Sequence, residues 1–195
     1  MELKERQYSV LTVSAQPKFN ESLKALLAER QYYRSELVES ISAAKRTAND
    51  AAYDFLIVNS PLPDDDGLRF AIDRSQGSRS SVLLLVRNEY YTEIFEQVCP
   101  YGVYTLPKPS PRQLVTQAFD WLESSCERLK NLEKRSVKLE DKMQEIRLVN
   151  RAKWLLISEK GLSEEDAHHS IEKLAMDRCV PKRVIAEEII AASGQ

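Results

Sequence analysis

The stretch YDFLIVNSPLPDDDG, Tyr53–Gly67, joins a short apolar run to a loop of turn-forming residues. Its run Phe55–Val58 is continuous, apolar and partly β-branched, which predicts a strand buried on both faces. The prolines and Gly67 that follow predict a turn. Strands buried on both faces are typical of parallel sheets covered by helices on both sides, so this stretch indicates an α/β fold.

Other runs on both sides of this stretch predict further strands. They are Tyr8–Val13, Ser35–Val38, Ser81–Val86 and Val103–Leu106. Helical patterns at Asn20–Ala28 and Ser40–Asn49 separate the first of these strands. This alternation of strands with helix-length segments predicts a flavodoxin-like (βα)5 domain over residues 1–120.

A long helical connector follows, because no glycine or proline occurs between Pro111 and Gly161. A heptad register places large apolar residues at the a and d positions, namely Leu122, Leu129, Leu132, Leu139, Met143 and Ile146. In a parallel dimer, Arg128 would face Glu133 across the seam. The pattern predicts a coiled-coil linker over residues 121–147 and a homodimer. A long amphipathic helix packed on its own domain would show the same pattern and is the alternative.

Residues 148–195 predict helices only. Gly161 suits the end of the long helix, and Ser163 suits the cap of the next helix. Pro181 suits the first turn of a last helix. Helices this short bury too little surface alone, so they must pack together or on a dimer partner. We therefore expect a small helical domain.

Composition excludes several classes of protein. The 195 residues include 28 Lys and Arg against 30 Asp and Glu, a formal charge of -2, which excludes a broadly basic nucleic-acid coat. No apolar run is long enough to span a membrane, and the start MELKERQYSV lacks the apolar core of a secretory signal. We therefore expect a cytoplasmic protein with no membrane association.

The chemistry-bearing residue types are sparse. Three widely spaced cysteines argue against a disulfide framework, and His168 with His169 as the sole histidines argues against a structural zinc site. The sequence has no pairing of a nucleophile with a base and no glycine-rich phosphate loop. We expect neither an enzyme nor a bound cofactor or metal ion.

Two segments resemble known domains. Tyr53–Gly67 resembles the third strand and following loop of response-regulator receiver domains, and the pair Lys108–Pro109 strengthens this resemblance. The segment from Glu140 to Ile190 resembles the ANTAR domain, an RNA-binding transcription antiterminator module. The residues that carry this second resemblance are Ala152-Lys153, Gly161-Leu162-Ser163, Ala167, Leu174–Asp177 and Ala186–Ile190. Together they imply a response regulator of two-component signal transduction with an ANTAR output domain.

The receiver resemblance implies a degenerate phosphorylation site. Asn59 stands where the phosphate-accepting aspartate is expected, and Ser14 and Ala15 stand at the positions of the acidic metal ligands. Val86 replaces the hydroxyl residue, so only Lys108 matches the pattern. An amide cannot form an acyl phosphate, so we expect a pseudo-receiver that is not phosphorylated in the presence of Mg²⁺.

Two neighbouring features have a structural as well as a functional interpretation. Asp64, Asp65 and Asp66 suggest a metal site, but we expect them to form a solvated turn before a helix. Lys108 either binds an anionic ligand in the vacated pocket or is a retained lysine beside a proline turn.

The ANTAR resemblance implies binding to RNA hairpins. The basic candidates are Arg147, Arg151, Lys153, Arg178, Lys182 and Arg183. They form a compact phosphate-binding surface if the group on the long helix and the group near Pro181 face the same side, and are ordinary solvated charges otherwise. Trp154 replaces the small residue usual in the family, and we expect it to pack against the last helix rather than stack on a base.

These interpretations predict a dimeric regulatory protein that binds paired hairpins in leader transcripts, prevents terminator formation and acts independently of aspartyl phosphorylation. The alternative is a dimeric scaffold or a ligand-sensing pseudo-receiver that does not bind RNA and contacts a partner regulator protein.

Overall fold

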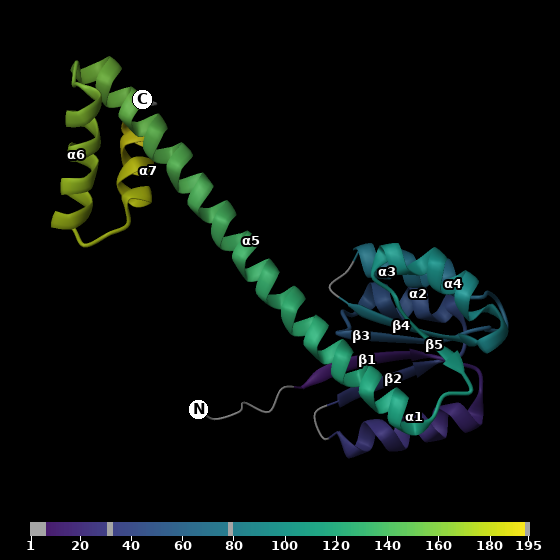
Figure 1. Ribbon diagram of the computed structural model, residues 1–195. Coiled ribbons are helices and arrows are strands. Elements are labelled where there is room, and N and C mark those ends of the chain that lie inside the picture. The colour runs from purple at the N-terminus through teal and green to yellow at the C-terminus, as the bar shows by residue number, and fades with distance from the viewer. Residues whose placement is uncertain (1–6, 31–32, 78–79, 194–195) are drawn as a thin grey trace. The chain divides into compact units, whose positions relative to one another are not determined.

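The computed structural model describes residues 7–30, 33–77 and 80–193. Contacts within the chain divide it into two units, Met1–Asn131 and Leu132–Gln195. The long helix α5 (Arg112–Lys160) contributes to both units (Figure 1). Within the described ranges, no helix combines the length and the apolar character needed to cross a membrane.

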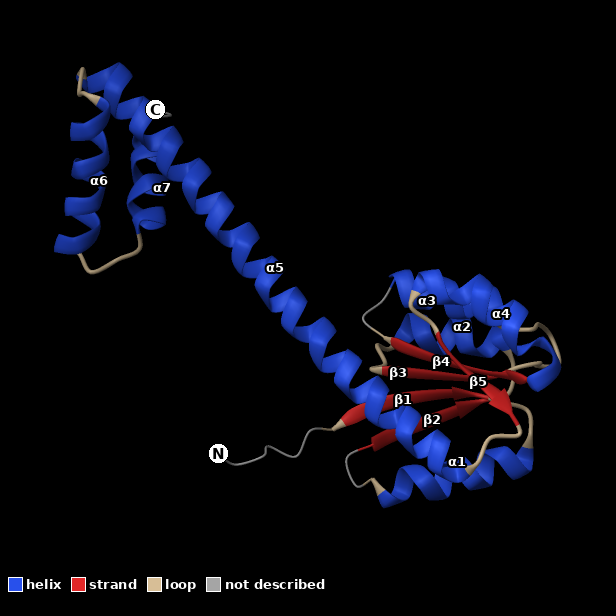
Figure 2. Cartoon of the chain, in the orientation of Figure 1, coloured by secondary structure: helices blue, strands red, loops and turns tan. Residues whose placement is uncertain are grey.

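The first unit contains a sheet of five parallel strands. The strands are β1 (Tyr8–Val13), β2 (Tyr33–Val38), β3 (Phe55–Asn59), β4 (Ser81–Arg87) and β5 (Tyr104–Lys108). Their order, β2-β1-β3-β4-β5, is that of flavodoxin-like domains, so the predicted fold class is confirmed (Figure 2).

Helices cover both faces of this sheet (Figure 1). The helices α1 (Pro17–Glu29) and the first part of α5 cover one face, and α2 (Ile41–Asp50), α3 (Leu68–Gly77) and α4 (Tyr91–Val98) cover the other. Successive strand residues point to opposite faces, so Phe55 and Ile57 pack toward α1 while Leu56 and Val58 pack toward α2. This is why the central strands β3 and β4 are apolar over most of their length.

Gly67, at the end of the segment Tyr53–Gly67, is required by the backbone. Its φ is +79°, a conformation that residues with a Cβ rarely adopt. A Cβ at this position would also lie 2.8 Å from Cγ1 of Val58. The loop after β3 therefore passes so close to the strand that only glycine fits.

The first turns of α5 belong to the core of the first unit. Leu122 is completely buried beside Phe119, so it is not available to a coiled-coil seam as the heptad register predicted. Lys130 pairs with Asp54 at 2.8 Å, which holds the helix on the domain beyond the boundary expected at residue 120. The first unit accordingly ends at Asn131.

The next turns of α5 have a different environment. The remaining residues of the predicted seam are exposed: Leu129, Leu132, Leu139, Met143 and Ile146. Leu139 is the most exposed of them, at 61%. These side chains do not pack on the described parts of their own chain, and dimerisation through them stays a prediction.

The second unit is a small bundle formed by the end of α5 with α6 (Glu164–Asp177) and α7 (Lys182–Ser193). Its buried centre contains Ala152, Ala167, Ala175 and Ala186, whose small side chains let the helices approach closely. Gly161 ends α5 with a φ of +65°, and the Ser163 hydroxyl accepts a hydrogen bond from the Asp166 amide at 3.1 Å, capping α6.

Candidate receiver site and nucleic-acid interface

The first candidate site lies at the carboxyl edge of the sheet. Ser14 follows β1, Asn59 ends β3 and Lys108 ends β5. The carboxyl ends of parallel strands meet at one edge, and ligands of this fold bind where the strand order changes direction, here between β1 and β3. The strands thus bring together residues that are far apart in the sequence.

Asn59 is the centre of this site and is completely buried. Its Nδ2 donates to Oγ of Ser14 at 2.9 Å and to Oε1 of Gln16 at 3.3 Å. Its Oδ1 accepts a hydrogen bond from Nζ of Lys108 at 2.6 Å. Gln16 was missed in the sequence, because a glutamine before a proline gives no functional signal. The amide is bonded on both sides and is fixed in orientation.

Lys108 carries the charge of the site. Its ammonium also donates to the carbonyl of Ser60. Burial, together with the positive charge of Arg87, holds the pKa of Lys108 below its usual value. Among the described residues, no carboxylate pairs with this ammonium. The site therefore has a positive charge that no described carboxylate neutralises.

The residues present do not fit the magnesium ion that a receiver site would hold. Mg²⁺ prefers carboxylate oxygens, whereas Ser14, Ala15 and Asn59 supply a hydroxyl, a methyl group and an amide. The amide oxygen is already bonded to Lys108. Val86 is buried in the core and offers no donor. In the part of the chain that the structure describes, no group of three His, Cys, Asp or Glu side chains is placed to hold a metal.

The acidic run after β3 serves as a set of turn caps. Asp64 accepts hydrogen bonds from the backbone amides of Ile41 and Ser42, each at 2.9 Å, and these bonds lower the pKa of its carboxyl group. Asp65 and Asp66 accept from backbone amides two residues ahead, at 2.7 and 3.0 Å. The carboxylates thus satisfy the amides at the start of α2 and in the loop before α3, as expected of a turn.

The second candidate site is the outer face of the last turns of α5. Arg147, Arg151 and Trp154 follow the spacing i, i+4, i+7, which places them on one stripe of the helix. The buried residues Val149 and Ala152 lie on the opposite side. Trp154 is 71% exposed, so the expectation that it packs against the last helix is wrong. The two arginines are exposed and have no ion pair within the described residues.

The other basic candidates are already paired with carboxylates. Lys153 bonds to Glu164 at 3.1 Å, Lys182 bonds to Glu172, and Arg183 bonds to Glu187 at 2.8 Å. Arg178 holds both carboxylate oxygens of Glu188, at 2.5 and 2.8 Å, which raises the pKa of the guanidinium. Their charges are therefore locally compensated.

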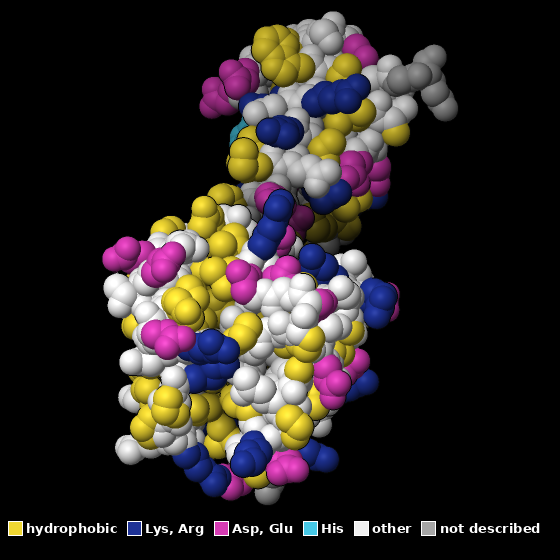
Figure 3. Space-filling model, turned by 90° about the vertical axis from the view of Figure 1, so that its right-hand side faces the viewer, with side chains coloured by type: hydrophobic (Ala, Val, Ile, Leu, Met, Phe, Trp, Pro, Cys, Tyr) yellow, Lys and Arg dark blue, Asp and Glu magenta, His cyan; other side chains and the backbone are white. Residues whose placement is uncertain are grey.

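The two basic groups do not form the single surface that the sequence suggested. Arg183 interacts electrostatically with Asp141 and Glu145 of α5. Glu145 lies one turn before the buried Val149, on the inner side of the helix, whereas Arg147 lies on the outer side. Charges of both signs are also interspersed over the face seen in Figure 3, without a broad basic area. Among the six basic candidates, only Arg147 and Arg151 have no ion pair with a described residue.

One protein-family profile matches most of the second unit. The family profile of the ANTAR domain matches residues 137–190, which include α6 and most of α7 and begin within the middle of α5. The transcriptional regulatory protein PdtaR of Mycobacterium tuberculosis, in strains CDC 1551 and H37Rv, is 25% identical over 142 residues. This match covers 72% of this chain and 69% of PdtaR.

Solved structures resemble the first unit. An adenylate cyclase structure from Rhodopirellula baltica matches with a TM-score of 0.58 and 19% identity, covering 69% of this chain and 98% of that one. The receiver domain of an HD domain-containing protein from Pseudomonas fluorescens Pf-5 matches with a TM-score of 0.57 and 20% identity, and the match covers 69% of this chain and 97% of that one. The receiver domain of the histidine kinase PA1611 from Pseudomonas aeruginosa matches with a TM-score of 0.50 and 21% identity, and the match covers 62% of this chain and 98% of that one. That structure holds a magnesium ion in its active-site cleft. These likenesses show that the first unit has the receiver fold.

Proposed function

We propose that this chain, which joins a domain of the receiver fold to an ANTAR domain in the arrangement of a response regulator, binds paired RNA hairpins in leader transcripts and prevents terminator formation. The observation that carries the proposal is the outer stripe of α5, Arg147, Arg151 and Trp154. It combines unpaired positive charge with an exposed aromatic ring in a domain that matches the ANTAR family.

The chemistry of this stripe suits a hairpin loop. Arginine side chains contact phosphates, and unstacked loop bases stack on aromatic rings. Trp154 lies seven positions after Arg147 on the helix, which is about 10 Å along the axis at about 1.5 Å per residue. One loop can therefore contact the arginines with its backbone and the indole with a base.

A dimer would present two such stripes. The exposed apolar residues Leu132, Leu139 and Ile146 recur every seven positions of α5, the repeat of a coiled-coil seam. Joining two ANTAR domains makes the second contact with a two-hairpin transcript intramolecular, so weak single contacts add to a useful affinity. This supports paired hairpins, rather than a single hairpin, as the target.

Phosphorylation is not the switch in this proposal. The buried amide of Asn59 occupies the position of the acceptor carboxylate, and Lys108 is bonded to that amide instead of to a phosphoryl group. Incubation of the full chain with acetyl phosphate and Mg²⁺ should give no covalent mass increase. A phosphoryl adduct on Asp64, Asp65 or Asp66 would contradict this part of the proposal.

The function is tested by RNA binding and by transcription. Fluorescence anisotropy should show that the full chain binds a transcript with two tandem hairpins at least about tenfold more tightly than either hairpin alone. Affinity should fall steeply as salt rises. In single-round transcription, the protein should increase read-through of a terminator placed after the hairpins.

A matched control separates loop recognition from simple attraction to phosphates. A transcript with the same stems but with the loop bases replaced by abasic linkers keeps the backbone and loses the stacking partners. It should bind about tenfold more weakly. Equal binding of both transcripts, or no binding of any hairpin, would favour the protein-interaction scaffold instead.

A further inference from the structure

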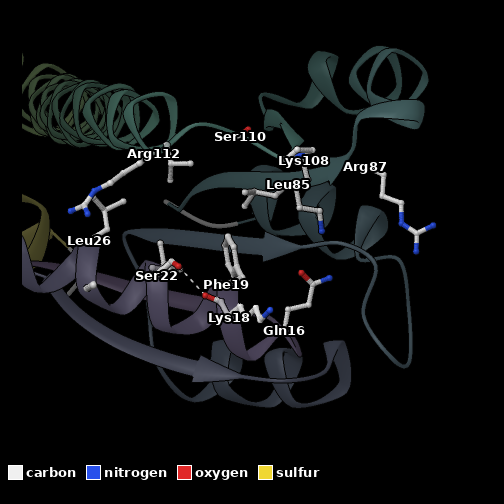
Figure 4. A pocket seen from close by; sticks show the side chains of 14 residues that line it. Gln16, Lys18, Phe19, Ser22, Leu26, Leu85, Arg87, Lys108, Ser110 and Arg112 are labelled. Carbon is white, nitrogen blue, oxygen red and sulfur yellow. Dashed lines mark hydrogen bonds between the residues drawn. The ribbon is translucent and has the colours of Figure 1, made fainter.

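A cavity opens beside the altered receiver site. Its volume is about 820 Å³, within the roughly 300–1,000 Å³ common for small-molecule sites. It lies between α1, the ends of β4 and β5, and the first turns of α5 (Figure 4). All of its lining residues belong to the first unit, so its shape does not depend on the second unit.

The cavity has an apolar wall and a polar end. Phe19, Leu26, Leu85 and Val115 contribute aliphatic and aromatic surface. Figure 4 shows the polar ends of Lys18, Gln16 and Lys108 gathered toward one end, with Leu26 and Arg112 toward the other. Gln16 and Lys108 both bond to Asn59, which fixes their places.

The polar end is positively charged without a counter-ion. An ammonium has three donors, and Lys108 uses two of them on Asn59 and the Ser60 carbonyl. Lys18 likewise has no ion pair among the described residues. The other basic side chains of the lining are engaged, since Arg112 pairs with Glu29 and Arg87 lies 3.7 Å from Glu89.

The substitutions at the receiver positions explain this charge. Carboxylates at the positions of Ser14, Ala15 and Asn59 would neutralise Lys108 and favour a cation, whereas the residues present leave a net positive charge. A partly desolvated charge is costly unless it is paired. An anion would offset that cost, and the adjoining wall would bury an apolar body.

We propose that this cavity is a binding site for a small organic anion that combines an apolar body with one acidic head group. The head group occupies the polar end between Lys18 and Lys108, and the body lies against Phe19, Leu26 and Val115. The site is separate from the RNA-binding stripe and stands whether or not the chain binds RNA.

The test uses 8-anilinonaphthalene-1-sulfonate, a fluorescent naphthalene with one sulfonate, on the full chain. We expect saturable binding of one probe per chain. N-phenyl-1-naphthylamine, which lacks the sulfonate, should bind at least about tenfold more weakly, because it loses the charge-assisted contacts. Amide chemical shifts should change on titration at Gln16, Ser22 and Ser110, which line the cavity.

Variants assign the binding to this cavity. Lys108→Gln and Lys18→Gln should each weaken sulfonate binding, by about tenfold for Lys108, and leave the uncharged probe unchanged. Lys24→Gln is the matched control, because Lys24 lies on the same helix as Lys18, is exposed and does not line the cavity. Ser22→Trp should fill the cavity and abolish the binding of both probes.

The outcomes are decisive even if one variant folds poorly. Circular dichroism and thermal unfolding check each fold, and Ser22→Trp and Lys18→Gln alter exposed positions of α1, so they keep the test valid without Lys108→Gln. Equal affinity for the two probes, several weak sites, or unchanged binding in the Lys18 and Ser22 variants would overturn the proposal.

Discussion

Two regions of the molecule hold positive charge that no carboxylate of the described residues neutralises, and they hold it differently. At the carboxyl edge of the sheet, Lys108 is half-buried, bonded to an amide and a carbonyl, and placed beside an apolar wall. On the outer face of α5, Arg147 and Arg151 are exposed and share their stripe with an exposed indole.

This difference separates two kinds of anion. A half-buried ammonium beside an apolar wall selects a small anion whose body leaves water, because partial desolvation strengthens the contact. Exposed charges in a row select a polyanion, since each phosphate contact is weak and is screened by salt. The paired cations Arg178, Lys182 and Arg183 provide the internal comparison, because they are as basic but already neutralised.

Removing the proposed dimer should have the greatest effect, because a two-hairpin transcript uses both stripes at once whereas each cavity binds its ligand within one chain. Leu139→Glu combined with Ile146→Glu should convert the dimer to a monomer, because charges replace apolar seam positions. Binding of a two-hairpin transcript should weaken by about 100-fold. Sedimentation measures the oligomeric state, and the sulfonate probe should still bind once per chain.

Val137→Glu is the matched control for the seam. Val137 is an exposed apolar residue of the same helix segment, but it lies outside the a and d positions. The Val137→Glu substitution should leave the dimer and the RNA affinity unchanged. A dimer that persists in the double variant would place the interface elsewhere on the chain.

The next effect contrasts the unpaired arginines with the paired ones. Arg147→Ala with Arg151→Ala should weaken RNA binding by about 30-fold and make the dependence of log Kd on log salt shallower by about 1 to 2. Arg178→Ala with Arg183→Ala should weaken it less than about threefold, since binding through these groups must first displace Glu188 and Glu187. The reverse ranking would refute the role given to the stripe.

Sequence patterns predicted the fold well, because alternating buried strands and helices leave a periodic signal at each position. The patterns were less informative about tertiary and intermolecular contacts, because these depend on which surfaces pack together. Leu122 fits a heptad but packs on its own domain, since own-domain and partner contacts have the same periodicity. The pair of Arg178 with Glu188 joins the turn after α6 to α7 across ten positions, which no local spacing predicts. Trp154 gave no signal that distinguishes packing from exposure.

Trp154→Ala tests the aromatic part of the stripe. RNA affinity should fall by about tenfold, because base–aromatic stacking contributes about 1–3 kcal/mol per base. Trp154→Phe should keep most of the affinity, and the thermal stability of both variants should match that of the parent chain because the indole is exposed. A loss of stability in the alanine variant would instead indicate a packing role.

Asn59→Asp gives Lys108 a carboxylate partner and so tests the charge of the cavity alone. The sulfonate probe should bind about fivefold more weakly, since the new charge competes for the ammonium. RNA binding should stay unchanged. The variant should still not accept phosphate from acetyl phosphate, because Ser14 and Ala15 supply no acidic metal ligand. Tighter probe binding in this variant would contradict the proposed head-group position.

The smallest expected effect is a difference in pH dependence between the two regions. The pKa of Lys108 is held below 10.5 by burial and by Arg87, so its charge is lost at lower pH than that of an exposed lysine. Sulfonate binding should weaken as the pH rises from about 7 through this lowered pKa, whereas arginine stays protonated throughout this range. In the range between its lowered pKa and 10.5, the unfolded chain binds more protons than the folded chain, so the stability contribution of Lys108 rises with pH there. A loss of probe affinity on raising the pH therefore reports the charge of the site and not unfolding.

The Asn59→Asp variant serves as the control for this pH dependence. Its carboxylate raises the pKa of Lys108, so the same loss of probe affinity should move to higher pH. A pH profile that does not move would assign the titration to another group.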